Sequence, residues 1–159
     1  MTSLRGSLRP ARAADLPRLT ELWIEIATHH TSLDPLFTLR PGAEPEVQRL
    51  IAALFGDPDA AIFVWEAPGD LLGFCAVRID LAPPILEETR RAEITDLGVS
   101  ATARREGIGR ELAAAALAWA KGRGVARLEV RVAARNREGQ AFWRSLGFDD
   151  LMDVLHRPL

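Results

Sequence analysis

Residues 92–112 read AEITDLGVSATARREGIGREL, and this stretch carries the pattern that decides the expected fold. The first part alternates as a strand does, and the last part begins an alanine-rich helix. A basic turn with Gly107 and Gly109 lies between the two parts. The first turn of a helix has unpaired N–H groups and the positive end of the helix dipole, so it attracts anions. The stretch therefore predicts a phosphate-binding turn, with counter-charges from Arg104, Arg105 and Arg110.

Two familiar nucleotide motifs do not fit this turn. A dinucleotide-binding fingerprint requires a small third residue where Leu112 stands. A Walker A loop requires Gly-Lys-Ser/Thr, which is absent here. Paired glycines at a helix start are also typical of tight turns and close packing. The glycines alone therefore leave a ligand site and a structural role both open.

Periodic apolar residues and turn residues predict the other elements. Their order, with strands and helices interleaved, predicts an α/β (α+β) fold with a mixed sheet and helices on both faces. The expected strands cover residues 8–11, 61–67, 71–80, 92–99, 126–133 and 153–156, and the expected helices cover 16–30, 47–54, 108–122 and a segment that starts at Asn136.

Length and composition favour one domain over residues 1–159, because 159 residues at 48% hydrophobic suffice for one core. The single cysteine, Cys75, cannot form an internal disulfide. No apolar run approaches the roughly 20 residues of a membrane span. We therefore expect a cytoplasmic protein that does not enter a membrane. We also expect no metal, because His29, His30 and His156 have no metal-binding spacing with Cys75.

The net charge of −2 conceals an uneven distribution of charge. Residues 99–144 contain ten Lys/Arg and four Asp/Glu, a balance of +6. Such a segment suits either nucleic acid or a small polyphosphate. No nucleic-acid motif is present, and the four tryptophans lie in apolar patterns that indicate packing rather than base stacking. We therefore expect a polyphosphate ligand and no nucleic-acid partner.

The pattern Arg104-x-x-Gly107-x-Gly109, after a strand that ends at Val99, resembles the Gln/Arg-x-x-Gly-x-Gly/Ala motif of the GNAT superfamily of N-acetyltransferases. This resemblance implies a mostly antiparallel sheet with a central strand splay, acetyl-CoA as cosubstrate, and a small-molecule or peptide amine as acceptor. It is also compatible with a homodimer. Further similar segments are Leu8-Arg9-Pro10 with Asp15-Leu16, Leu128 to Val132, Asn136, Ala141-Phe142 and Leu146-Gly147-Phe148.

The resemblance also implies which residues bind the cofactor. Backbone groups of Leu97, Gly98 and Val99 would pair with the pantetheine arm. Asn136 matches a cofactor-contacting position, and a plain helix N-cap is the alternative. The pyrophosphate would lie on the turn that comprises Arg104, Arg105, Glu106, Gly107, Ile108, Gly109 and Arg110.

Acetyl transfer to an amine requires a base, because an alkylamine of pKa near ~10.4 is only about one part in 10³ to 10⁴ neutral at pH 7. Glu93 matches the position from which some family members supply that base. Strand alternation is expected to place Glu93 on one face and Asp96 on the other. We favour Glu93 over Asp96 as base, and a solvated carboxylate that only attracts the amine is the alternative. A backbone N–H near residues 97–99 would stabilise the oxyanion.

The phrase Ala141-Phe142-Trp143 departs from the family, which often has a tyrosine there as the acid. This chain contains no tyrosine. An indole N–H does not ionise usefully, so we expect Trp143 to pack or to shape the site. A CoA thiolate is a tolerable leaving group, and solvent, Cys75 or a histidine could protonate it. The missing tyrosine also motivates a second hypothesis, a non-catalytic acyl-CoA-binding sensor.

Overall fold

The computed structural model describes residues 6–159, and its centre is a five-stranded sheet in the order β1-β2-β3-β4-β5. The first four strands pair antiparallel, and β5 runs parallel to β4. The mixed, mostly antiparallel sheet is therefore confirmed. The strands are β1 (Ser7–Pro10), β2 (Ala60–Ala67), β3 (Asp70–Leu81), β4 (Arg90–Val99) and β5 (Leu128–Val130).

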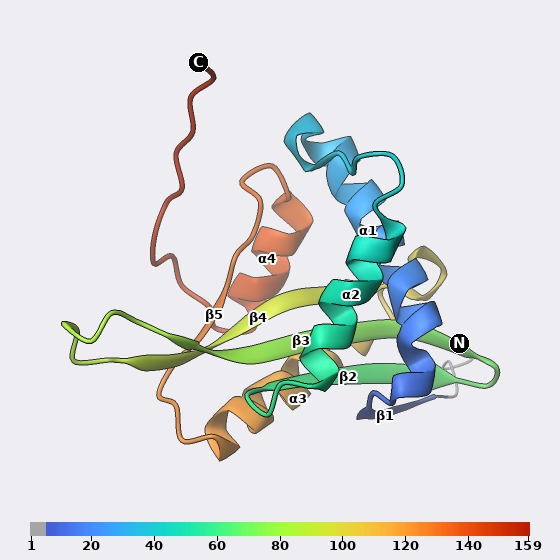
Figure 1. Ribbon diagram of the computed structural model, residues 1–159, viewed down its shortest axis with the longest axis horizontal. Coiled ribbons are helices and arrows are strands. Elements are labelled where there is room, and N and C mark those ends of the chain that lie inside the picture. The colour runs from blue at the N-terminus through green and yellow to red at the C-terminus, as the bar shows by residue number, and fades with distance from the viewer. Residues whose placement is uncertain (1–5) are drawn as a thin grey trace.

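Helices cover both faces of this sheet (Figure 1). One face carries α1 (Leu16–Leu33) and α2 (Glu44–Phe55), and the other carries α3 (Ile108–Gly122) and α4 (Arg137–Ser145). Single 3₁₀ turns precede α1, follow it and precede α3: η1 (Ala13–Asp15), η2 (Pro35–Phe37) and η3 (Ala101–Ala103).

Each face of the sheet has its own apolar core, because successive residues of a strand point to opposite sides. Phe74 and Ala76 of β3 pack with the residues of α1 and α2. Cys75 and Val77 alternate with these two residues along β3 and therefore point to the other face, where they pack with α3 and with Trp143 of α4. The central strands are therefore covered on both sides, and this holds the helices in place around the end of β4.

The predicted strand over residues 153–156 is wrong. Residues 149–159 contain no helix or strand, and their apolar side chains are exposed, with Leu155 at 91%. In Figure 1 this tail runs away from the sheet. The predicted strand over 126–133 shortens to β5. An alternating pattern forms a strand only where a neighbouring strand completes its hydrogen bonds, and no described strand lies beside residues 153–156. The pairing of β5 with β4 ends at Val130 and Ile94.

A bulge interrupts β4 in the middle of the sheet. Asp96 lies opposite Ala76 of β3 and Ile94 lies opposite Val77, so Thr95 is an extra residue without a partner on β3. On the other side, β5 pairs with β4 only as far as Ile94 and Val130. From Thr95 to Val99 this side of β4 has no neighbouring strand among the described residues, which confirms the expected splay.

The bulge also corrects the expectation that Glu93 and Asp96 face opposite ways. Glu93 lies opposite Arg78 and Asp96 lies opposite Ala76, and these two positions of β3 share a face. Both carboxylates therefore point to the side of α1 and α2. The extra residue at Thr95 shifts the alternation by one position, and a purely local pattern does not reveal it.

Candidate functional site

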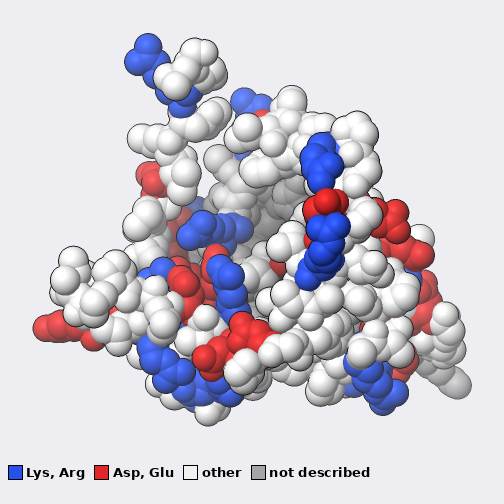
Figure 2. All heavy atoms as spheres, in the orientation of Figure 1, with Lys and Arg blue, Asp and Glu red and all other residues white. Residues whose placement is uncertain are grey.

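A cavity of about 1090 Å³ opens where β4 and β5 separate. Its walls come from α1 and η2 on one side and from the start of α3 and from α4 on the other, with β4 between them. Figure 2 shows the surface hollowed between the regions of α1 and α4. This volume is at the upper end of what ligand pockets usually enclose, so the cavity can hold a large ligand and a small one together.

The turn before α3 forms the cationic end of the cavity. Gly107 is the N-cap of α3 with φ of +84°, a backbone conformation that strains residues with a side chain. Arg104, Arg105 and Arg110 line the cavity here, and none of them forms an ion pair within residues 6–159. Arg110 only donates a hydrogen bond to Ser145 Oγ, at 3.3 Å. Unpaired positive charge therefore gathers at a helix N-terminus, as an anion site requires.

Gly109 and Gly98 differ in how closely their neighbours approach, since a Cβ would be in ordinary contact at Gly109 and in a severe clash at Gly98. A Cβ on Gly109 would lie 3.4 Å from Cζ of Phe142 in α4. A Cβ on Gly98 would lie 1.5 Å from Cδ1 of Ile26 in α1, which is an impossible contact. Gly98 therefore lets α1 pack directly against β4, a role that the sequence did not suggest.

Most residues predicted to contact the cofactor lie on the cavity wall. Glu106 is the exception, because its exposed side chain does not line the cavity. Asn136 lines the cavity and also accepts a hydrogen bond from Gly139 N, at 3.0 Å, so its role as N-cap of α4 is confirmed. The predicted residues on the wall are Leu97, Gly98, Val99, Arg104, Arg105, Gly107, Ile108, Gly109, Arg110 and Asn136.

The two candidate bases differ in position. Asp96 lines the cavity and accepts a hydrogen bond from the indole Nε1 of Trp23, at 2.8 Å. Glu93 does not line the cavity, and its side chain is only 9% exposed. It lies 3.0 Å from Arg78 Nη2 and 3.5 Å from Arg131 Nε, so its buried charge is paired. The fold therefore brings Asp96, and not Glu93, to the cavity wall.

Trp143 packs as expected. It is 8% exposed, and its ring meets Phe142 and Phe148 edge to face, with centroids 5.0 and 5.1 Å apart. Cys75 is fully buried and does not line the cavity. Burial raises the pKa of the Cys75 thiol far above its ordinary value, and the negative charge of Asp96 raises it further. The thiol is therefore not placed to protonate a leaving group in the cavity.

The sequence did not identify the wall that α1 and η2 contribute. His29 and His30 lie near the end of the helix predicted over residues 16–30 and were not assigned to the site, but both line the cavity, with Trp23 of the same helix. The usable signal was the helical spacing of Trp23, Ile26 and His30, which places them on one face of α1. Only packing against β4 turns that face toward Asp96.

None of the helices within residues 6–159 has the length and apolar character needed to cross a membrane. No group of three or more His, Cys, Asp or Glu residues among these same residues is arranged to hold a metal ion.

Comparisons with known proteins agree with this architecture. The model of the acetyltransferase (GNAT) family matches residues 18–148. A comparison with curated protein sequences finds no match.

Solved structures share the fold along nearly the whole chain. A mutant BH1408 protein from Bacillus halodurans has a TM-score of 0.86 and 21% identity, and the match covers 96% of this chain and 99% of that one. An aminoglycoside 6'-N-acetyltransferase from Acinetobacter haemolyticus has a TM-score of 0.76, 19% identity and coverage of 96% and 97%. The aminoglycoside N-acetyltransferase AAC(6')-Iy in complex with CoA has a TM-score of 0.77, 17% identity and coverage of 98% and 95%.

Proposed function

We propose that this chain, which belongs to the acetyltransferase (GNAT) family, transfers an acetyl group from acetyl-CoA to a primary amine within a ternary complex. One observation carries the proposal. A single cavity runs from the cationic turn before α3, along the open edge of β4, to Asp96 and the wall of α1. Both reactants could therefore meet beside β4.

The cationic half of the cavity fits acetyl-CoA. The amides of the α3 N-terminus suit a pyrophosphate, and so do Arg104, Arg105 and Arg110, which form no ion pair within residues 6–159. The open edge of β4 from Thr95 to Val99 offers backbone groups to the amides of a pantetheine arm, as a sheet edge does to an added strand. The structural similarity to an acetyltransferase in complex with CoA supports this placement.

The other half of the cavity suits a small amine with one ammonium group on an apolar body. Asp96 is the carboxylate on this wall, and Trp23, Leu36 and Phe37 lie on the same side of the cavity. Across the whole lining, two carboxylates (Asp96 and Glu138) stand against four arginines. Three of these arginines lie at the turn proposed for the pyrophosphate, so the acceptor wall itself offers Asp96 for one ammonium group, and we propose a monoamine rather than an aminoglycoside as the acceptor.

In the proposed reaction the neutral amine nitrogen attacks the thioester carbonyl carbon, and the carbon–sulfur bond then breaks. A backbone N–H of residues 97–99 stabilises the oxyanion of the tetrahedral intermediate. The ammonium loses two protons in total: one ends on the CoA thiolate and the other reaches solvent. Asp96 holds the ammonium before it loses the first proton. Glu93 lies off the wall and would act as base only through an intervening water.

An amine panel with acetyl-CoA, read by thiol release and by the mass of the product, tests the proposal. Aryl-alkylamines are expected to react with a higher kcat/KM than polyamines, aminoglycosides or peptide amines. Gly109→Asp should weaken acetyl-CoA binding at least ~10-fold in calorimetry, through its charge and its contact with Phe142. Gly122→Asp is the matched control at the far end of α3, where an added Cβ meets no atom within 4 Å.

A non-catalytic acyl-CoA sensor is the second candidate, favoured by the absence of tyrosine and the packed Trp143. Saturable acetyl-CoA binding without product from any amine would establish the sensor. Unchanged acetyl-CoA affinity in folded Gly109→Asp would remove the proposed cofactor site.

We also propose that residues 1–159 form one domain located in the cytoplasm. Limited proteolysis and cell fractionation test these points, and sedimentation distinguishes a monomer from a homodimer.

A further inference from the structure

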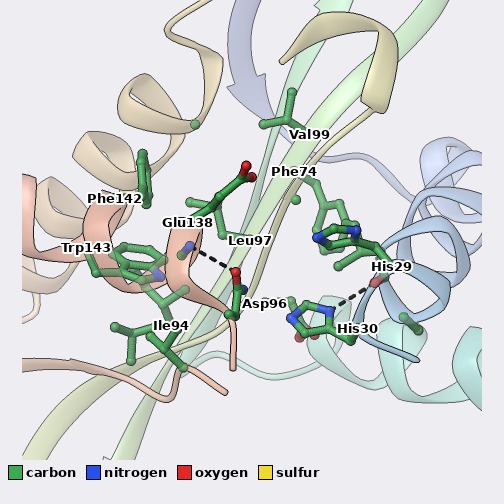
Figure 3. A pocket seen from close by; sticks show the side chains of 18 of the residues that line it. His29, His30, Phe74, Ile94, Asp96, Leu97, Val99, Glu138, Phe142 and Trp143 are labelled. Atoms are coloured by element: carbon green, nitrogen blue, oxygen red, sulfur yellow. Dashed lines mark hydrogen bonds between the residues drawn. The ribbon is translucent and has the colours of Figure 1, made fainter. Parts of the chain in front are cut away.

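We infer that His30 is the catalytic group that takes the first proton from the bound ammonium, a role that rests on the proposed acetyl transfer. His30 lies near the end of α1 and lines the acceptor half of the cavity. Figure 3 shows His30 and His29 on one side, Phe142 and Trp143 on the other, and Asp96 between them.

One hydrogen bond determines which ring nitrogen of His30 is available. Nδ1 lies 2.9 Å from the backbone carbonyl oxygen of Ile26, one turn earlier in α1. A carbonyl oxygen only accepts, so Nδ1 carries the hydrogen and donates it. In the neutral ring Nε2 then carries the lone pair. The imidazole is therefore held in the tautomer that can accept a proton at Nε2.

The same contacts keep the ring in place before and after it accepts a proton. Both nitrogens of an imidazolium donate, so protonation at Nε2 leaves the bond to Ile26 intact. The ring also meets Phe37 of η2 edge to face, with centroids 6.2 Å apart. In Figure 3 the nitrogen without a drawn hydrogen bond is on the side of the ring toward Asp96.

Charged and titratable groups surround His30 on several elements, and Asp96 is the one that can hold the ammonium beside it. Asp96 approaches from β4, and His29 adjoins it on α1 with ring centroids 6.1 Å apart. Asp34 follows α1 and is paired with Arg135 at 3.4 Å. Arg131, after β5, also lines the cavity, at 3.5 Å from Glu93. Asp96 is therefore the carboxylate on the wall that His30 faces, and it can hold an ammonium while His30 removes its proton.

An imidazole suits this step better than a carboxylate. Imidazole ordinarily titrates near ~6.5 and aspartate near ~3.9, whereas an alkylammonium titrates near ~10.4. Proton transfer to imidazole is therefore less unfavourable by more than two orders of magnitude. The carboxylate of Asp96 attracts the ammonium and then stabilises the imidazolium.

R–NH₃⁺ gives one proton to Nε2 of His30, which becomes imidazolium, and the freed nitrogen lone pair forms the bond to the acetyl carbonyl carbon. The carbon–sulfur bond breaks, and the electron pair leaves on sulfur. The second nitrogen proton goes to the thiolate, giving the amide and the CoA thiol. The imidazolium then returns its proton to solvent, so one proton is released for each turnover.

The test uses the full chain and the best amine of the panel. His30→Asn removes the base but keeps an amide that can donate to the Ile26 carbonyl. Its kcat/KM at pH 7 should fall at least ~10²-fold, while the affinity for acetyl-CoA stays within about twofold. The loss should shrink as the pH approaches the pKa of the amine, because the neutral amine then needs no base.

Chemical rescue separates a catalytic role from a structural one. Added imidazole should restore turnover in His30→Ala, and substituted imidazoles of higher pKa should restore it more, because proton transfer follows the basicity of the acceptor. A purely structural side chain would give no dependence on that basicity. His156→Asn, in the exposed tail, is the control and should keep wild-type turnover. The kcat/KM of His29→Asn should still fall at acid pH as that of the wild type does, because the proposed base, His30, is unchanged.

Two results overturn the proposal and leave acetyl transfer standing. The first is a His30→Asn variant with the wild-type pH profile and rate. The second is a His30→Ala variant that binds acetyl-CoA but is not rescued by any imidazole. If the wild type instead gives no product with any amine, the proposed function fails first, and the role of His30 fails with it.

Discussion

Replacing Gly98 by Ala should force α1 away from β4, and the expected cost follows from the contact distances. The added Cβ would lie 1.5 Å from Cδ1 and 2.5 Å from Cγ1 of Ile26. Ordinary carbon contacts lie near ~3.5 Å, so Ile26 or the helix must move by about 2 Å. Overpacking of this kind typically lowers the free energy of unfolding by about 1–3 kcal/mol. Because α1 also carries Trp23 and His30, turnover should fall as well.

A double-mutant cycle with Ile26→Ala isolates this clash. Truncation removes Cδ1 and Cγ1, and the nearest remaining Ile26 atom, Cβ, lies 3.6 Å from the new methyl group, which is ordinary contact. Ile26→Ala alone should cost roughly 1–2 kcal/mol, less than a fully buried truncation, because Ile26 is half-buried. The double variant should cost about the same as Ile26→Ala alone, so the two changes should couple by on the order of 1–3 kcal/mol.

Urea unfolding followed by tryptophan fluorescence measures all four free energies. Gly122→Ala is the control, because a Cβ there meets no atom within 4 Å and the site is helical, so stability should not fall. Additive effects of Gly98→Ala and Ile26→Ala, to within about 0.5 kcal/mol, would refute the packing explanation.

Three further predictions concern charge and packing near the site and at the start of α1. Glu93→Gln should lower the free energy of unfolding by about 1–2 kcal/mol, because it weakens the buried pairing with Arg78 and Arg131, and should change kcat/KM less than tenfold. A loss of ~10²-fold that shrinks at high pH would instead make Glu93 the base. Trp143→Phe should keep turnover within about tenfold, and a collapse of ~10³-fold in a folded, CoA-binding variant would contradict a packing role. Hydrogen bonding to Arg9 lowers the pKa of Asp15, so its contribution to stability is present above the unfolded-state pKa and is lost as the pH falls through the lower folded-state pKa. Urea midpoints from pH 7 to pH 3 should therefore fall less in Arg9→Leu than in the wild type, and parallel curves would count against this pairing.

Local chemistry is enough to predict the turn before α3 and most of the elements around it. Gly107 and the arginines beside it predict a helix start that attracts anions, because every helix N-terminus has unpaired N–H groups and the positive end of the helix dipole. Asn136 likewise predicts the start of α4, because its side chain accepts a hydrogen bond from the backbone N–H of Gly139, only three residues away. The packing of Trp143 was also predictable, because its apolar neighbours are close in sequence.

Tertiary structure decided the features that depend on distant segments. The bulge at Thr95 depends on how β4 pairs with β3. It places Glu93 and Asp96 on the same face of the sheet, whereas simple alternation along the strand would place them on opposite faces. The pattern over residues 153–156 stays unpaired because no described strand lies beside it. Gly98 and His30 acquire their roles only when α1 packs on β4, some 70 residues away in sequence. Contacts across such separations depend on which surfaces bury each other, and a sequence read locally carries no signal for that choice.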